Sequence, residues 1–389
     1  MSALLAVFAF SGCATMPTPK VAMTGDVLVD GPKMAAEGPP RDRVLWQYRT
    51  AAAAMRQGKF AEAKPLLDDA LRTLQGIFGP DAEARKSRSV FSREARKTFI
   101  GEPYERSMAY IYRGVLYWMD GELDNARACF RSAQFEDSDT ENKEYAGDWV
   151  LPDYLEALAT AKLGGDGTDA FKRAQTSVKN ATLPPLDPGV NTLFFVEFGP
   201  GPAKYATGEY SQELRFRIAT SPVRSALLKV NTLNIPIAPV DDVGFQATTR
   251  GGRLMDHILA NKAVFKSTTD TAGNAAIMSG AILAGTGHRS GTAADEIGAG
   301  LMVAGLVSKL ISAAATPEAD TRAWDNLPQF ITFAQLALPA GPHTATIEFI
   351  GQDGKPVANL TKTITFTVPH GGPDKVIFVS DTSTTPQTQ

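Results

Sequence analysis

The chain has 389 residues, of which 43% are hydrophobic and 21% are charged, as in an ordinary folded protein with room for more than one domain. A formal net charge of −3 gives no overall field that would steer the molecule to nucleic acid or to an acidic substrate. The two cysteines, Cys13 and Cys129, form no disulfide framework if Cys13 is modified, and no histidine has a second ligand at zinc-site spacing. We therefore expect no cofactor, no metal and no nucleic-acid partner.

The N-terminus reads as a secretory signal. Residues 3–10 are all apolar, and Ser11, Gly12 and Cys13 follow. The run is too short to span a bilayer but suits the apolar region of a signal peptide. It resembles a bacterial lipoprotein signal, in which the cysteine thiol receives a diacylglycerol; the alternative is an apolar N-terminus with a buried cysteine. No Lys or Arg precedes the run, so we expect the true start codon to lie upstream.

This resemblance predicts a signal peptide over 1–12, lipid attachment at Cys13 and a proline-rich tether over 13–40. Ala14 follows the cysteine where an Asp would imply the inner membrane. The sorting rule of the lipoprotein class therefore implies a lipid anchor in the outer membrane, with the protein facing the periplasm.

Residues 41–180 show a helical period and a repeated pattern. Two glycines, Gly58 and Gly121, are each followed by apolar residues at offsets +2, +5, +9 and +12, which are Phe60, Ala63, Leu67 and Ala70 in one copy and Leu123, Ala126, Phe130 and Ala133 in the other. A weaker third copy starts at Gly165. The pattern resembles the tetratricopeptide repeat, a pair of antiparallel helices joined at a glycine turn. Such repeats either bind a protein segment on their concave surface or only brace the next domain.

Two polar clusters and one cysteine lie in the same region. A basic helix face faces either solvent or an anionic envelope component; it comprises Lys86, Ser89, Arg93 and Lys97. Asp137, Asp139 and Glu141 have the spacing of a calcium loop, but Asn142 stands where the loop needs glycine, so we expect an ordinary acidic loop. Cys129 lies at a helical apolar position and should pack as a small core residue.

A break at residues 181–190, with three prolines and a glycine, separates this region from a segment with period 2. Residues 190–380 therefore predict an antiparallel β-sandwich-like domain, and 381–389 a disordered tail. The Ala/Gly-rich residues 251–316 interrupt the strands. They form either two buried helices that complete the core or, over 273–315, a hairpin that contacts a membrane or a partner. The overall class is α+β and multidomain.

The motifs of phosphate loops and serine hydrolases are incomplete in this sequence. Thr286 stands in place of the lysine of a phosphate loop, and no G-x-S-x-G elbow occurs. We expect no catalytic residue. An enzyme that acts on an envelope polymer through carboxylates distant in sequence is the alternative, because such pairs leave no linear motif.

Two short stretches carry a family resemblance. Glu102-Pro103-Tyr104-Glu105-Arg106 and Asp320-Thr321-Arg322-x-Trp324 resemble segments of an uncharacterised family of bacterial lipoproteins with tetratricopeptide-like repeats. The resemblance implies an envelope lipoprotein and weakly implies an association with regulators of cell-wall synthesis, but it supplies no catalytic residue. The Ala/Gly-rich insert departs from the family.

The residues that carry the resemblance are a partner-binding or structural signature, namely Glu102, Tyr104, Arg106, Arg322 and Trp324. Physically, Asp320 and Arg322 can form a local ion pair, and Trp324 an aromatic plug between the insert and the sheet. The sequence as a whole predicts a non-enzymatic scaffold that binds protein partners in the cell envelope.

Overall fold

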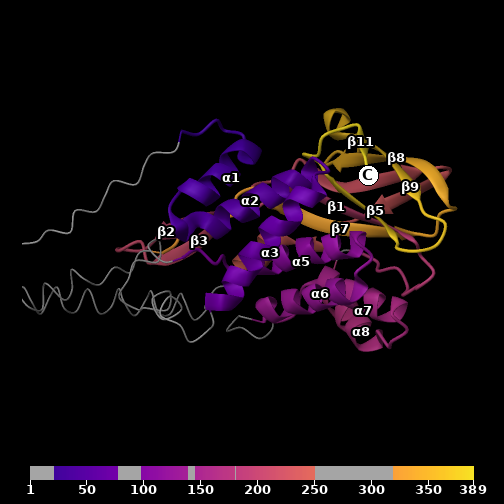
Figure 1. The fold of residues 1–389 in the computed structure, drawn as a ribbon, viewed down its shortest axis with the longest axis horizontal. Coiled ribbons are helices and arrows are strands. Elements are labelled where there is room, and N and C mark those ends of the chain that lie inside the picture. Colours follow the sequence, from indigo (N-terminus) through magenta and orange to yellow (C-terminus); the bar gives the residue numbers. More distant parts are fainter. Residues whose placement is uncertain (1–21, 78–97, 139–144, 180, 250–318) are drawn as a thin grey trace, which may run out of the picture.

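The computed structural model describes residues 22–77, 98–138, 145–179, 181–249 and 319–389 (Figure 1). Cys13, the basic face at 86–97 and the insert at 251–316 lie outside these ranges. The described helices before the first strand are α1 (Val27–Glu37), α2 (Arg43–Arg56), α3 (Phe60–Ile77), α5 (Pro103–Met119), α6 (Leu123–Asp137), α7 (Val150–Lys162) and α8 (Thr168–Ser177), with a 3-10 turn at Pro40–Asp42. In this part of the chain no helix is long and apolar enough to cross a membrane.

Glycine turns join the helices in pairs. Gly58, Gly121 and Gly164 have φ angles of +70°, +77° and +79° and stand between α2 and α3, α5 and α6, and α7 and α8. This left-handed conformation favours glycine because a Cβ atom would clash with the backbone. The third turn residue is Gly164, one position before the glycine expected from the sequence. In each of the first two copies, the apolar positions after Ala63 or Ala126 are buried, as the repeated pattern predicts.

Helix α5 lies at the centre of the molecule. Nearly all its residues from Pro103 to Trp118 are buried, so it is covered on every side. It approaches α6 closely at Gly114, where an added Cβ would lie 2.5 Å from Cε1 of Phe130. Cys129 on α6 is buried, and desolvation raises the pKa of its thiol to about 12, so it packs as the small core residue expected.

The second half of the chain forms mixed sheets. Its described strands are β1 (Thr192–Pro200), β2 (Ala203–Thr207), β3 (Glu213–Arg217), β4 (Val223–Val230), β5 (Leu233–Ile237), β6 (Asp241–Asp242), β7 (Pro328–Leu336), β8 (Gly341–Gly351), β9 (Lys362–Val368), β10 (Lys375–Ser380) and β11 (Gln387–Thr388). A short helix, α9 (Val243–Thr248), follows β6. The four-stranded sheet has the order β10-β1-β7-β6, the five-stranded sheet β11-β9-β8-β4-β5, and β2 and β3 form a separate ribbon.

The expectation of a purely antiparallel domain is wrong. Strand β10 pairs parallel to β1, and β11 pairs parallel to β9, whereas β1–β7, β4–β8 and β8–β9 are antiparallel. Alternating hydrophobicity marks a strand but carries no record of the direction of its neighbour. The pairing partner was therefore not readable from the period alone.

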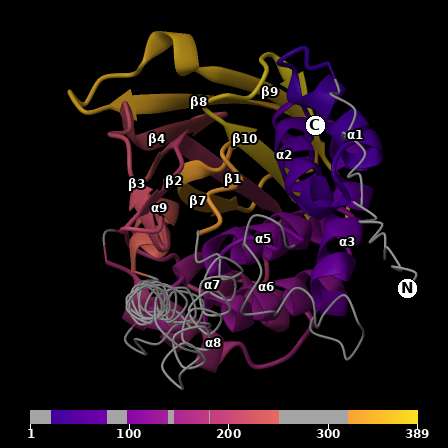
Figure 2. The same cartoon turned by 90° about the vertical axis from the view of Figure 1, so that its left-hand side faces the viewer.

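The four-stranded sheet is the middle layer (Figure 2). Along β1, Leu193 and Phe195 pack into the core shared with the helices, whereas Phe194, Val196 and Phe198 pack into the core shared with the five-stranded sheet. Because successive side chains of a strand point to opposite faces, one strand serves both cores. The helices, the four-stranded sheet and the five-stranded sheet thus lie in sequence.

Part of the expected tether is a helix. Helix α1 occupies residues 27–37, and the Asp26 carboxylate caps it by accepting the N–H of Leu28 at 2.9 Å. The helix lies so close to α2 that a Cβ added at Gly31 would meet Oγ1 of Thr50. Proline content therefore misled the prediction, because Pro32 is accommodated inside this helix.

The last residues, expected to be disordered, form strand β11 beside β9. The side-chain amide of Gln389 extends the arrangement to β10: it accepts the Phe378 N–H at 2.9 Å and donates to the Phe378 carbonyl at 2.7 Å. The tail also reaches α2, since Thr384 N–H donates to the carbonyl of Arg56. Hydrogen bonds from threonine and glutamine thus order residues 381–389, although their polar composition predicted disorder.

Candidate functional site: a buried polar junction at helix α5

The junction begins at the N-terminus of α5. Pro103 occupies the first turn, where a missing N–H costs nothing. The Glu102 N–H donates to Oε2 of Glu105 at 2.7 Å, the return bond of a capping box. The stretch Glu-Pro-Tyr-Glu therefore starts the helix and fixes the rotamer of Glu105.

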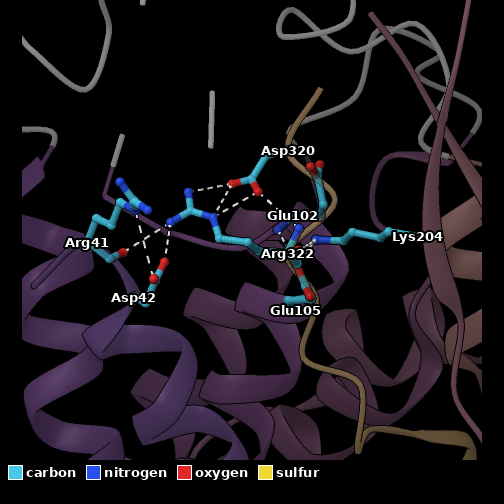
Figure 3. A network of polar contacts seen from close by, with 7 residues as sticks. All are labelled: Arg41, Asp42, Glu102, Glu105, Lys204, Asp320 and Arg322. Carbon is cyan, nitrogen blue, oxygen red and sulfur yellow. Dashed lines mark hydrogen bonds and ion pairs between the residues drawn. The ribbon is translucent and has the colours of Figure 1, made fainter. Parts of the chain in front are cut away.

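Glu105 joins three parts of the chain, and Figure 3 shows its ion pair with Lys204. Its Oε2 lies 2.5 Å from Nζ of Lys204 on β2, and its Oε1 accepts the N–H of Trp324 at 2.7 Å. Both charged side chains are at least 98% buried, with 0% and 2% exposure. Burial raises the pKa of Glu105, while Lys204 and the Trp324 N–H act to lower it. One carboxylate thus connects the central helix, the ribbon and the segment that precedes β7.

Arg322 extends the junction to the start of α2. Its guanidinium donates to Asp320, with Nη2 at 2.6 Å from Oδ2, and to Oδ1 of Asp42 at 2.7 Å. Its carbonyl accepts Nζ of Lys204 at 3.1 Å. Arg41 adds a longer pair to Asp42 at 3.8 Å. The ion pair expected between Asp320 and Arg322 is present, and it is part of a network that spans helix, ribbon and connecting segment (Figure 3).

Trp324 fills the space beneath this network. Its indole is 1% exposed, stacks on Tyr48 of α2 and meets Tyr112 of α5 edge-on, with ring centroids 5.7 Å apart. The plug therefore packs against α2 and α5, and the insert, which the sequence placed on one side of it, lies outside the described residues. A ring this large needs a cavity that only tertiary packing creates.

The five signature residues come together at the end of α5. Tyr104 packs edge-on against Phe216 of β3, and Nε of Arg106 lies 2.5 Å from Oε2 of Glu136. Glu102, Arg322 and Trp324 occupy the positions described above, whereas the proposed lipid site Cys13 lies outside the described residues. Sequence reasoning missed Lys204, Asp42 and Glu136, because no local spacing connects them to α5.

A second buried junction ties the helices to the middle sheet. Glu197 of β1 is 1% exposed and pairs with Nε of Arg56 at 2.5 Å. It also accepts a hydrogen bond from the Tyr112 hydroxyl. Burial raises the pKa of Tyr112 well above its ordinary value, so this phenol remains a donor at any physiological pH. No sequence signal marked this triad.

A third junction lies where β6 meets α7. Asp241 is 5% exposed, and its two oxygens accept the N–H groups of Val150 and Leu151 at 2.8 and 2.7 Å. Burial raises the pKa of Asp241 to about 7, and it raises that of Asp153, which pairs with Arg173, to about 6. The Asp241 carboxylate thus acts as an N-cap supplied by another element.

The acidic loop has a structural part as well. Asp137 accepts the N–H groups of Gly147 and Asp148 at 2.6 and 3.1 Å and so closes the connection between α6 and α7. Asp139 and Glu141 lie outside the described residues. Within the described ranges, no group of three or more His, Cys, Asp or Glu side chains is placed to hold a metal ion. The first two junctions connect parts of the fold through buried charge pairs, and the third does so through a carboxyl group that accepts backbone N–H groups.

No protein-family model matches the chain, and no curated protein or solved structure matches it either. The lipoprotein family named from Glu102–Arg106 and Asp320–Trp324 therefore stays a prediction. Any function assigned to the chain rests on its own residues and geometry.

Proposed function

We propose that the protein is a non-enzymatic lipoprotein of the cell envelope, anchored to the outer membrane at Cys13, which serves as a scaffold for a protein partner in the periplasm. The observation that carries the proposal is the succession of three helix pairs with glycine turns at Gly58, Gly121 and Gly164. Such arrays are used chiefly to bind other protein chains. The apolar run before Ser11-Gly12-Cys13 supports the anchor.

In this proposal the helix pairs are tetratricopeptide-like repeats, and the two sheets that share a core are a sandwich-like domain. The shared offsets after Gly58 and Gly121 support the first assignment. The common core of Phe194, Leu228 and Phe349 between the two sheets supports the second.

In two of the pairs, the first helix packs one of its faces against the middle sheet. Tyr112 of α5 packs on Phe378 of β10, and Tyr154 of α7 packs on Phe333 of β7, with ring centroids 5.9 and 4.5 Å apart. That face braces the middle sheet. We therefore assign the partner-binding surface to the second helices, α3, α6 and α8, where Phe135 of α6 is 75% exposed.

Site-specific photocrosslinking in intact cells tests the scaffold. A photoreactive phenylalanine replaces Phe135 on α6 or Arg72 on α3, and a matched control replaces Leu233, which is 42% exposed on β5. We expect one and the same protein to be crosslinked from both helix positions and not from Leu233. Crosslinks that form from Leu233 alone, or from none of the positions, would contradict the proposal.

The anchor has its own test, because both cysteines can be replaced separately. Metabolic labelling with a fatty-acid analogue should label the wild type and the buried Cys129→Ser control but not Cys13→Ser. Label that persists in Cys13→Ser would remove the anchor from the proposal and leave the scaffold untouched.

One observation favours the enzyme alternative. Burial raises the pKa values of Asp153 and Asp241 into the range suited to general acid catalysis. Both carboxylates are buried and engaged with other groups, which argues against access by a polymer. Release of soluble fragments from purified cell-wall polymer by the wild type, and its loss in Asp153→Asn, would favour the enzyme.

A further inference from the structure

Strand β10 is one edge of the four-stranded sheet, and its backbone groups face two ways. At its two ends, the N–H groups of Lys375 and Asp381 donate to carbonyls at the two ends of the paired stretch of β1. In a parallel pair, successive residues turn their backbone groups to opposite sides of the strand. The N–H groups of Phe378 and Ser380 therefore point away from β1, toward the open edge of the sheet.

The tail that follows β10, residues 381–389, covers this edge with side chains. The side-chain amide of Gln389 accepts the Phe378 N–H at 2.9 Å and donates to the Phe378 carbonyl at 2.7 Å. The Ser383 hydroxyl accepts the Ser380 N–H at 2.8 Å. An amide side chain offers the same donor and acceptor as a peptide group. Gln389 thus occupies the hydrogen-bonding positions that a neighbouring strand would use.

The tail supplies hydrogen bonds to the edge but no apolar surface. In β10, Val376 and Phe378 belong to the core on the helix side, and Ile377 and Val379 belong to the core between the sheets. Residues 381–389, all of which the structure describes, contribute no side chain to either core. A hydrogen bond within the protein replaces one to water, whereas apolar burial is the main favourable term in folding and association. An incoming segment can therefore replace the contacts of the tail and add burial to them.

The outer strand of the other sheet is protected in a different way. β5 carries the exposed Pro236, a residue that interrupts strand pairing permanently because it has no N–H group. The cover of β10 is instead a separate segment held by hydrogen bonds, which can leave and return. This difference marks β10 as the edge that a second chain can reach.

We propose that the edge of β10 is a docking site for an extended segment of a partner protein, and that the tail over 381–389 is an internal cover which this segment displaces. A strand added beside β10 forms the backbone bonds now made by Gln389 and Ser383. Its side chains alternate between the two cores, which the tail leaves without an apolar contribution. The partner segment is therefore free of proline and apolar at alternate positions. The site is separate from the helix surface assigned above.

Fluorescence anisotropy with a labelled short peptide of alternating valine and threonine tests the site on the full chain carrying Cys13→Ser. The control peptide has the same valines and end groups but proline in place of threonine, so it cannot form a ladder of backbone bonds. We expect the valine–threonine peptide to bind at least about tenfold more tightly than the control. Gln389→Ala should increase its affinity about tenfold, because the edge is then open in a larger fraction of molecules.

Two further variants separate release of the cover from a general change in the sheets. Gln389→Glu keeps an acceptor for the Phe378 N–H but has no donor for the carbonyl, so its affinity should lie between those of the wild type and Gln389→Ala. Gln352→Ala removes an exposed amide that donates to the Ser221 carbonyl, and it should bind the peptide like the wild type.

Amide hydrogen exchange locates the bound peptide. The Phe378 N–H should exchange faster in Gln389→Ala and slow again when the valine–threonine peptide is added, a recovery that a purely structural tail would not give. The proposal fails if Gln389→Ala binds the peptide no better than the wild type, if both peptides bind equally, or if neither binds at millimolar concentration. A Gln389→Ala dimer that excludes the peptide would overturn it in favour of a second copy of the chain at this edge.

Discussion

The indole ring of Trp324 stacks on the phenol ring of Tyr48, with centroids 4.5 Å apart and ring planes 18° from parallel. Trp324 belongs to the segment that leads into β7, and Tyr48 to helix α2. The backbone N–H of Trp324 also donates to the Glu105 carboxylate. Trp324 therefore contributes both an aromatic and a polar contact to the same junction. Stacked aromatic pairs add stability beyond the area that they bury.

Replacing Trp324 by Ala should lower the free energy of unfolding by about 3–5 kcal/mol, because a fully buried ring leaves a cavity that its neighbours cannot fill. Urea unfolding followed by far-UV circular dichroism measures the loss. Trp46→Ala is the matched control, since Trp46 on α2 is only half-buried. Equal losses in the two variants would show that Trp324 is not a central contact.

The buried pair Glu105–Lys204 should behave differently from a surface pair. Lys204→Met leaves the Glu105 carboxylate buried without its cation, and we expect a loss of about 3–5 kcal/mol. Adding Glu105→Gln to Lys204→Met should recover part of that loss, because the second change removes the uncompensated charge. The measurement is a double-mutant cycle by urea unfolding.

The control cycle uses Lys229 and Glu348, whose side chains are 41% and 19% exposed at a distance of 2.5 Å. This partly exposed pair should show a coupling of about 0–1 kcal/mol. A coupling between Glu105 and Lys204 no larger than that of the control would contradict the account of the junction.

Asp241 should make stability depend on pH. Burial raises its pKa to about 7 in the folded protein, whereas the unfolded chain has an ordinary aspartate value near 4. Between these values the folded state holds a proton that the unfolded state releases, so the free energy of unfolding falls as the pH rises from about 4 to about 7. Asp153, with a pKa of about 6, contributes in the same direction.

Urea midpoints at pH 5, 6, 7 and 8 measure this dependence. Asp241→Asn should be less stable at pH 8, where the amide offers one acceptor oxygen and the carboxylate two to the N–H groups of α7. Its decline with pH should be shallower than that of the wild type, because an amide does not titrate. Asp124→Asn replaces a side chain that is 75% exposed and should keep the wild-type slope. Identical slopes in all three proteins would rule out Asp241 as the titrating group.

Two helix glycines should respond to alanine with opposite signs. A Cβ at Gly114 would lie 2.5 Å from Phe130, so Gly114→Ala should cost about 1–3 kcal/mol by overpacking α5 against α6. Gly76 on α3 has no atom within 4 Å of an added Cβ, and Gly76→Ala should stabilise by up to about 1 kcal/mol through helix propensity. Thermal unfolding of both variants provides the measurement, and a stabilising Gly114→Ala would contradict the close approach.

Local patterns predicted much of the fold. Alternating apolar residues located β1 and β7 to β10, and the glycine offsets located the turns of two helix pairs. The parallel pairing of β10 with β1 escaped prediction because it depends on contacts far apart in the chain. Helix α1 and strand β11 escaped for the same reason, because Thr50, which lies against α1, and Phe378, which bonds Gln389 next to β11, belong to other segments.

In the candidate site, too, the local contacts could be predicted from the sequence and the long-range contacts could not. The capping box at Glu102 and Glu105 and the pair Asp320–Arg322 are local, and short spacing in the sequence marks both. Lys204 reaches Glu105 from another element, and Glu197 meets Arg56 across the layers. No periodicity encodes such long-range charge pairing, which only the packed structure reveals.

The parallel pairing of β1 with β10 has a consequence for how the chain acquires its structure. β10 completes the middle sheet, on which both hydrophobic cores depend, and it comes from residues 375–380. During synthesis, nearly the whole chain must therefore be made before the apolar faces of the helices and of strand β1 are fully covered. Long-range pairing of this kind slows folding and prolongs the exposure of apolar surface. The apolar faces of the helices and of β1 therefore stay uncovered until residues 375–380 have been synthesised.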